Sequence, residues 1–171
     1  YDYQYNTLAR ENLLIEAAPE HFARHSHWLS AAMAFNIKEY LRMQASLLMT
    51  QITNSQSSTT NSPRVTPGVF LSFRPYPKID LSLNAFYKQS YRYPTFNDLY
   101  YTDLGNANLR PELARQHSVE IAYSIQKSAF SIQASASYYY NRVTDKIIAY
   151  PKGQQFRWTM LNLGTVKING V

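Results

Sequence analysis

The 171-residue sequence contains no cysteine, which excludes a disulfide framework and thiolate metal sites. Charged residues make up only 16% of the chain, below the usual share of about 25%. No apolar run reaches about 18 residues, so a transmembrane helix is excluded, and no secretory signal peptide is recognisable. The motifs GxSxG and HExxH and phosphate-binding glycine loops are also missing, which argues against an enzyme.

The residues that are present favour β structure. Apolar residues make up 45% of the chain, too many for a disordered protein, and tyrosine occurs 15 times. Valine, isoleucine, threonine, tyrosine and phenylalanine suit a pleated, half-buried surface. The net charge is +6, but the basic residues are scattered and form no stripe, so nucleic-acid binding is not predicted.

Apolar and polar residues alternate through most of the chain, which indicates strands with two unlike faces. The clearest runs extend from Phe130 to Val143 and from Ile79 to Tyr93. Shorter or weaker runs cover residues 29–37, 41–49, 69–73, 119–125 and 156–171. About seven or eight strands are therefore expected, and the clearest are long enough to cross a bilayer, which takes about 9–11 residues.

The predicted connections alternate in length. Short turns are expected near Lys38–Glu39 and at residues 75–78 and 126–128, whereas long polar stretches cover residues 53–63, 94–114 and roughly 144–155. Short turns on one side and long loops on the other are typical of an outer-membrane barrel. Aromatic residues accompany both ends, as in interfacial girdles: Phe35, Tyr40, Phe73, Tyr76 and Phe130 near the short turns, and Tyr87, Tyr91, Tyr93, Tyr138 and Tyr140 towards the long loops.

Two features are open to other interpretations. A soluble antiparallel meander also alternates when one of its faces is wet. The first 27 residues show no clear period, and residues 11–24 form either a short helix or part of an extended loop, with Pro19 arguing against a continuous helix.

The segment from Ser90 to Glu120 reads SYRYPTFNDLYYTDLGNANLRPELARQHSVE and resembles the signature of TonB-dependent outer-membrane receptors. The matching structural residues are Pro94, Gly105, Asn106, Asn108, Pro111, Glu112 and Glu120. A second match, Asn162-Leu163-Gly164 followed by Val166 and Gly170, resembles a late strand of the same family. The resemblance covers roughly residues 64–171, and the earlier part agrees only in strand rhythm.

The resemblance implies an all-β fold, an antiparallel up-and-down meander that forms a partial arc of a 22-stranded transmembrane β-barrel. Residues 1–171 would be a fragment of the barrel domain, without the plug domain or a signal peptide. It implies an outer-membrane transport receptor for a scarce nutrient, namely an iron–siderophore complex, haem or cobalamin. The implied partners are outer-membrane lipid, the nutrient, and the TonB complex through an N-terminal part outside these residues.

No cofactor is implied, and the isolated fragment is expected to self-associate through its open edges. The alternatives are another outer-membrane barrel, such as an adhesin or an enzyme, and a soluble β-sheet binding module.

The residue types in this motif also predict its local structure. Pro94 and Pro111 lack an amide donor and stop strand pairing, so they bracket a rim loop of about twenty residues, long enough to be a functional candidate. Gly105-Asn106 is a turn signal, and Asn106 and Asn108 can bond to nearby backbone. Glu112 is expected to accept backbone or arginine donors.

The candidate ligand-binding residues lie in or beside this loop: Arg92, Tyr93, Phe96, Tyr100, Tyr101 and Arg110. Their alternative roles are aromatic packing at the rim and pairing of the arginines with Glu112 or Glu120. Asp98 and Asp103 are expected to be solvated. His21, His25 and His27 lie close in sequence, but no carboxylate or cysteine stands at ligand spacing, so no metal site is predicted.

Overall fold

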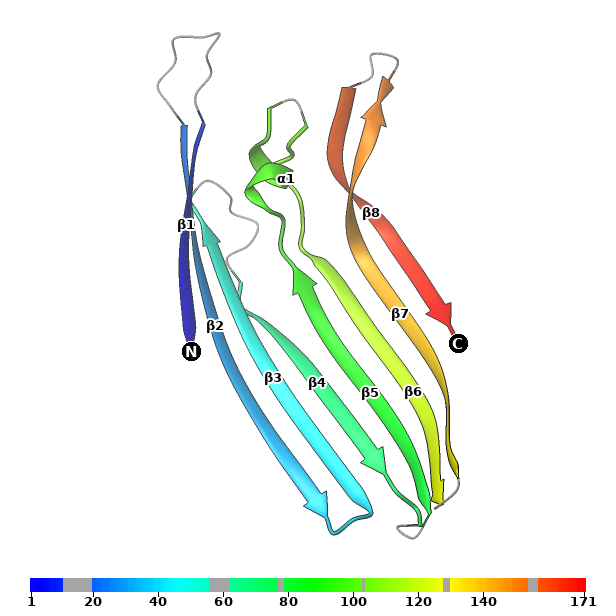
Figure 1. Ribbon diagram of the computed structural model, residues 1–171. Coiled ribbons are helices and arrows are strands. Elements are labelled where there is room, and N and C mark those ends of the chain that lie inside the picture. The colour runs from blue at the N-terminus through cyan, green and yellow to red at the C-terminus, as the bar shows by residue number, and fades with distance from the viewer. Residues whose placement is uncertain (11–19, 56–61, 77–78, 103, 128–129, 154–156) are drawn as a thin grey trace.

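A computed structural model describes residues 1–10, 20–55, 62–76, 79–102, 104–127, 130–153 and 157–171, which form one eight-stranded antiparallel sheet (Figure 1). The strands follow one another in chain order: β1 (Asp2–Arg10), β2 (Glu20–Ile37), β3 (Leu41–Asn54), β4 (Arg64–Phe73), β5 (Asp80–Arg92), β6 (Glu112–Lys127), β7 (Phe130–Lys152) and β8 (Arg157–Gly170). One short helix, α1 (Phe96–Tyr100), lies between β5 and β6. In the described part of the chain, no helix has the length and apolar character to cross a membrane.

The sheet has two chemically different faces, because side chains alternate along each strand and directly paired residues share a face. On the apolar face, one continuous row of paired residues crosses six strands: Phe35, Met43, Leu71, Ala85, Val119 and Tyr138. The polar face carries the row Arg42, Ser72, Asn84, Glu120 and Ser137.

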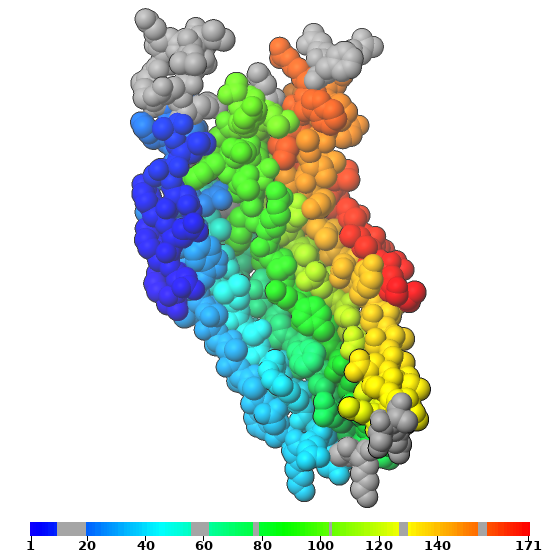
Figure 2. All heavy atoms as spheres, in the orientation of Figure 1, coloured from blue at the N-terminus to red at the C-terminus, as the bar shows by residue number. Residues whose placement is uncertain are grey.

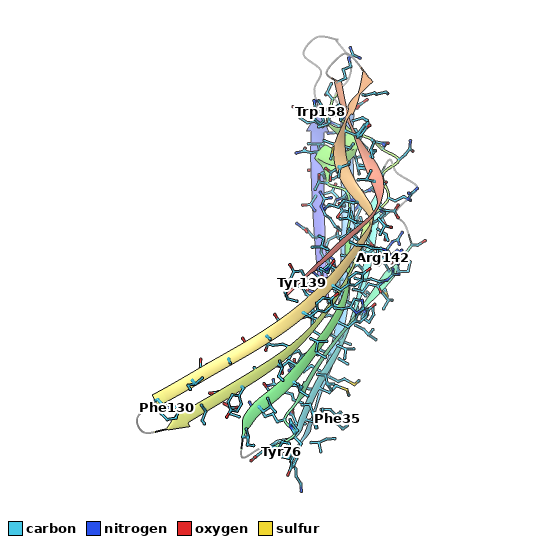
Figure 3. The ribbon with its side chains drawn as sticks, turned by 90° about the vertical axis from the view of Figure 1, so that its right-hand side faces the viewer. Phe35, Tyr76, Phe130, Tyr139, Arg142 and Trp158 are labelled. Carbon is cyan, nitrogen blue, oxygen red and sulfur yellow. The ribbon has the colours of Figure 1, made fainter. Side chains whose placement is uncertain are left out.

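The apolar face is largely uncovered. Phe35 is 61% exposed and Val119 is 57% exposed, although both side chains are wholly apolar. The sheet is long and curved, and Phe35 and Tyr139 lie on opposite sides of it (Figure 3). A contiguous exposed apolar surface of this kind marks contact with a membrane or a partner. The arrangement is that of a wall, with lipid-compatible side chains on one side and hydrophilic ones on the other.

The buried residues gather at the end of the sheet that carries α1, far from the short turns (Figure 1). Their cluster consists of Phe22, Leu99, Tyr100, Leu109 and Ile147, with Leu8, Phe96 and Met160 packed against it. These side chains come from β1, β2, β7, β8 and the segment between β5 and β6. The hydrophobic core is therefore local, and it forms where that segment folds over the polar face.

The predicted meander is confirmed, and so is the difference in connection length, except for the connection between β7 and β8. Residues 38–40 form a tight turn between β2 and β3, with Lys38 at a positive φ of 46° and the Tyr40 amide donating to the Ile37 carbonyl at 3.1 Å. The other two short turns fall between Phe73 and Asp80 and between Lys127 and Phe130, and residues 77–78 and 128–129 of them lie outside the described residues. The long connection after Asn54 is likewise described only at its ends, residue 55 and residues 62–63.

The aromatic residues follow the predicted two-ended distribution with one exception. The five near the short turns are all exposed: Phe35, Tyr40, Phe73, Tyr76 and Phe130. Tyr87, Tyr138 and Tyr140 belong to the apolar face towards the other end, since they share it with Ala85 and Val119 through the strand register. Tyr93 instead lies beyond the end of β5, in the segment that leads to α1.

The expectation of a helix or loop at residues 11–24 is wrong for residues 20–24, which belong to β2 and pair with β1. Residues 11–19 lie outside the described residues. The alternation is weak here because both faces of this hairpin carry polar or aromatic side chains. His25 and His27 contact Tyr3 and Tyr1 on one face, while Ser26 is buried on the other.

The long loop expected at about residues 144–155 is also wrong over most of its length. Strand β7 continues to Lys152 and pairs with β8 as far as Arg157, so the connection is short. The sequence does not reveal this part of the strand, because Asp145 has a positive φ of 55° and interrupts the alternation of side chains between the two faces from Thr144 to Ile147. Residues 154–156 lie outside the described residues.

The two edge strands generate a prediction about the isolated chain. Within the described residues, β1 and β8 are each paired on one side only, so both expose a row of backbone donors and acceptors. We expect the isolated 171-residue chain to self-associate in detergent-free buffer, because it combines open edges with an exposed apolar face. Sedimentation velocity measures this, with a detergent-solubilised sample as the control. A monodisperse monomer without detergent would contradict the expectation.

Candidate functional site: the rim loop between β5 and β6

The rim loop, residues 93–111, begins with a capped helical turn. The Thr95 hydroxyl accepts the Asp98 amide at 3.1 Å, and Asp98 Oδ2 accepts the Thr95 amide at 2.9 Å, which is a reciprocal capping box. Pro94 precedes the cap, is buried, and cannot donate to the sheet, so pairing between β5 and β6 stops at Arg92 and Glu112. The sequence PTFND therefore ends a strand and starts a helix within five residues.

Glu112 is the centre of an ionic network at the foot of the loop. Glu112 is only 5% exposed. Its carboxylate accepts hydrogen bonds from Arg92 at 2.9 Å, from Lys146 at 3.3 Å and from the Ile147 amide at 2.7 Å. Arg92 also pairs with Asp98 at 3.2 Å. A buried carboxylate is tolerated when charges and hydrogen bonds satisfy it, and the partners of Glu112 come from β5 and β7.

On one side the loop packs against β2. Tyr100 stacks on Phe22 with ring centroids 3.9 Å apart, and burial raises the pKa of the Tyr100 hydroxyl. Arg24 donates to the Pro94 carbonyl at 2.8 Å and to Asn54 at 2.7 Å, and it lies 4.9 Å from the ring centroid of Phe96. These contacts explain why Pro94 and Phe96 sit over strands that are distant in sequence.

On the other side the loop is bound to β7 and β8. The Asn106 side chain donates to the Met160 carbonyl at 2.9 Å, and the Met160 amide donates back to the Leu104 carbonyl at 2.9 Å. Asn162 accepts from the Arg110 amide and donates to the Arg110 carbonyl, both at 2.9 Å. Asn162 thus pairs with the backbone of the loop as a neighbouring strand would.

Figure 2 shows the consequence, with the atoms of the rim loop lying between those of β1–β2 and those of β7–β8. The rim loop thus links β2 to β7 and β8, which lie several strands away in the sheet. The loop is therefore an ordered part of the wall, held by ion pairs, side chain–backbone hydrogen bonds and a small apolar core.

The six predicted ligand-binding residues are placed differently from one another. Arg92 pairs with the carboxylate of Glu112, and Arg110 pairs with Asp145 at 2.6 Å. The hydrogen bond to Asp145 raises the pKa of Arg110. Phe96 and Tyr100 pack between the loop and β2. Tyr101 is 60% exposed.

Tyr93 is the exception among these residues. Its hydroxyl is buried and has no hydrogen-bond partner among the described residues, and burial raises its pKa. It lines a pocket at the point where β4 and β5 separate above the Gly68–Lys88 pair, together with Trp28, Thr50, Ile52, Thr66 and Ser90. Most of these side chains belong to the polar face, so the pocket offers hydroxyl groups beside aromatic and aliphatic surface.

Most of the motif residues are brought together, and two are not. Pro94, Gly105, Asn106, Asn108, Pro111, Glu112 and Asn162 all lie in or against the loop, and Asn106 accepts the Asn108 amide at 3.0 Å as the turn signal predicts. Glu120 lies lower on the polar face and accepts from Asn84 at 3.0 Å. Gly164 has no atom within 4 Å of the position of an added Cβ.

Several residues that shape the site are not among the predicted candidates. Asp98 was expected to be solvated but is buried, because it caps α1 and pairs with Arg92. The T-x-x-D spacing from Thr95 to Asp98 is the signal that identifies it. Arg24 and Asp145 bond to the loop from other strands, and Asn54 accepts from Arg24. No local sequence pattern indicates these contacts. Asp103 lies outside the described residues.

Among the described residues, no three histidine, aspartate or glutamate side chains are grouped closely enough to hold a metal ion. His21 and His25 lie on a strand and not on a helix. His25 Nδ1 forms a hydrogen bond with the Tyr3 hydroxyl at 2.9 Å, and His27 Nδ1 forms one with the Tyr1 hydroxyl at 2.7 Å.

Comparison with known proteins places this geometry in a family. Residues 4–171 match the family described as "TonB dependent receptor-like, beta-barrel". Two vitamin B12 transporters named BtuB are similar in sequence. The one from Vibrio vulnificus is 36% identical over 81 residues, 47% of this chain and 13% of the relative, and the one from Photobacterium profundum is 29% identical over 99 residues, 54% of this chain and 15% of the relative.

Solved structures agree in fold. The copper transporter OprC superposes with a TM-score of 0.66 at 16% identity, covering 95% of this chain and 28% of that protein. The FrpB iron transporter from Neisseria meningitidis (F3-3 variant) gives a TM-score of 0.60 at 16% identity, covering 88% of this chain and 23% of that protein. The chain thus spans only a small part of the length of the proteins that it matches.

The buried carboxylate yields a stability prediction. Glu112→Ala would leave the Ile147 amide without its acceptor and two cations without a shared partner, so we expect a loss of about 2–3 kcal/mol in the free energy of unfolding. Glu120→Ala, which removes one hydrogen bond on the same face, should cost about 1 kcal/mol. Equilibrium urea unfolding of the full-length protein in lipid vesicles measures both, and equal losses would show that the network is not special.

Gly105 provides a second prediction, because an added Cβ would lie 2.7 Å from the Leu99 carbonyl oxygen and the Tyr101 nitrogen. These are backbone atoms and cannot move aside without distorting α1. Gly105→Ala should therefore destabilise the loop by about 1–3 kcal/mol, whereas Gly164→Ala should be neutral or slightly stabilising. Hydrogen exchange of the loop amides reports the difference, and unchanged protection in the Gly105 variant would refute the steric argument.

Proposed function

Because the chain belongs to the family of TonB-dependent receptor β-barrels, we propose that it forms part of the barrel wall and an extracellular rim loop of an outer-membrane nutrient transporter. The observation that carries this is the division of the sheet into an exposed apolar face and a polar face over which an ordered loop is folded. Lipid would cover the first face, and the second would line the interior through which the nutrient passes.

The transported nutrient is proposed to be a small molecule of the cobalamin or iron-complex class. The sequence relatives carry vitamin B12 in their names, which favours cobalamin, while the structural neighbours are named for iron and copper. Transport would be driven by the TonB complex, acting through a part of the protein outside these 171 residues. The chain's own contribution is capture and passage, without chemistry.

Within the rim loop, Tyr93 and Tyr101 are the proposed ligand contacts. Arg92, Phe96, Tyr100 and Arg110 are occupied by internal contacts, so their role is to hold the loop in shape. The Tyr93 hydroxyl is buried beside a pocket without a partner, and buried polar groups are normally satisfied. A ligand that donates to or accepts from this hydroxyl would satisfy it.

The test measures binding of cyanocobalamin, a ferric siderophore and Cu²⁺ to the full-length receptor. Tyr93→Phe removes only the hydroxyl, so we expect affinity for the bound nutrient to fall by about three- to tenfold, the value of one neutral hydrogen bond, with the fold unchanged. Tyr138→Phe, on the apolar face, is the matched control and should bind normally.

The two levels of the proposal fail in different ways. If the intact receptor bound neither cyanocobalamin nor the ferric siderophore, the nutrient class would be wrong. If it bound one of them and Tyr93→Phe bound equally well, the assignment of Tyr93 would be wrong while the transporter function stood.

A further inference from the structure

Three cations stand side by side on the apolar face. Arg115 of β6 is directly opposite Arg142 of β7, and Arg142 is directly opposite Lys167 of β8. Like charges in direct opposition destabilise a sheet, since paired residues are only about 5 Å apart. The ion pairs found in the described residues involve Arg92, Arg110 and Lys146 and none of this basic row.

The strand register places the basic row on the side that lipid would cover. Arg115 is separated from Val119 by four residues, and Arg142 from Tyr138 by four, so both share the apolar face with the row of Phe35. Figure 3 shows Arg142 on the same side of the sheet as Phe35 and on the side opposite Tyr139. Arg142 and Lys167 are exposed, and Arg115 is half-buried.

The height of the row along the strands is equally informative. Strand β7 starts at Phe130 beside a short turn, Tyr138 is its ninth residue, and Arg142 is its thirteenth. A strand crosses the hydrocarbon within about 9–11 residues, so the basic row lies just beyond it, on the side of the rim loop.

An aromatic row lies directly below the basic row. His117 contacts Tyr87 at a ring-centroid distance of 4.9 Å and Tyr140 at 6.1 Å. Amphipathic rings mark the boundary between hydrocarbon and headgroups, so the next residues along each strand reach the headgroup layer.

Acidic side chains are missing from this surface. The positions that share the apolar face along residues 113–125 of β6, 130–144 of β7 and 165–171 of β8 include no aspartate or glutamate. The acids of these strands, Glu112, Glu120 and Asp145, accept hydrogen bonds from partners in the loop or on the polar face. The basic row therefore presents uncompensated positive charge at the level of the lipid headgroups.

We propose that the basic row binds the phosphate groups of a phosphorylated glycolipid in the outer leaflet, with the lipid chains lying on the apolar surface below. Guanidinium groups grip phosphate through paired hydrogen bonds, and an anion between Arg115, Arg142 and Lys167 removes their mutual repulsion. Gln89, opposite Arg115, adds an amide donor. The inference uses the membrane placement of the barrel and does not depend on which nutrient is carried.

The experiment uses the full-length receptor in detergent micelles and counts bound lipid by native mass spectrometry, with bis-phosphorylated lipid A as the probe. The triple variant Arg115→Gln, Arg142→Gln, Lys167→Gln should lose at least about tenfold in affinity, because each cation near a charged lipid surface contributes separately. The control Arg42→Gln, Arg74→Gln, Lys88→Gln removes the same charge elsewhere and should change affinity less than about twofold.

Two further arms identify the ligand. Lipid A without its phosphates should bind the wild type and the triple variant equally weakly, and inorganic phosphate should compete poorly because it lacks acyl chains. Arg142→Lys, which keeps the charge, should retain most of the binding. Unchanged lipid A binding in the folded triple variant, verified by its heat-dependent gel mobility, would overturn the proposal, as would equal binding of the dephosphorylated lipid.

Discussion

The buried carboxylate of Glu112 holds the upper part of this structure together. It begins β6, and it receives donors from the end of β5 and from the irregular point of β7 beside Asp145. Without it, the chain between Pro94 and Pro111 would have an apolar cluster but no fixed direction of entry and exit. Because ionic contacts are stronger away from bulk water, one residue that is almost fully buried can orient segments that are far apart in sequence.

The burial pattern of the protein is reversed relative to that of a water-soluble sheet. Large apolar residues such as Phe35, Met33 and Val119 are exposed, while Ser26, Thr50 and Thr66 are buried. In water this arrangement would be unstable, but in a bilayer the exposed apolar side chains lie in hydrocarbon. The rim loop adds the small conventional core that the wall itself lacks, and it does so above the bilayer, where the hydrophobic effect operates.

The sequence predicts the strands best where they cross the membrane, since there the two faces differ most. The run from Phe130 to Tyr140 is apolar on one face and small or polar on the other, and its strand is confirmed. The prediction fails in β1, the start of β2 and the end of β7, where both faces carry mixed side chains and the period of two disappears.

The candidate site could be predicted only in part for a similar reason. Pro94, Gly105 and Pro111 are local signals whose meaning depends on backbone geometry, so they identify the loop correctly. The partners that hold it, such as Arg24 and Asn162, come from strands about 70 and 50 residues away, and their role depends on the register of the whole sheet. Asp98 is buried rather than solvated because it caps a helix of only five residues, which is too short to show a helical period in the sequence.

The rim loop also spans the concave side of the curved sheet and connects strands that are far apart in it. Its ends leave neighbouring strands, yet its middle is bound to β2 on one side and to β7 and β8 on the other. Because the loop has a fixed length, it limits the curvature of the strands between its contacts. These strands cannot move apart without breaking the hydrogen bonds and ion pairs of the loop. Any change in the curvature of the sheet must then arise outside the strands that the loop joins.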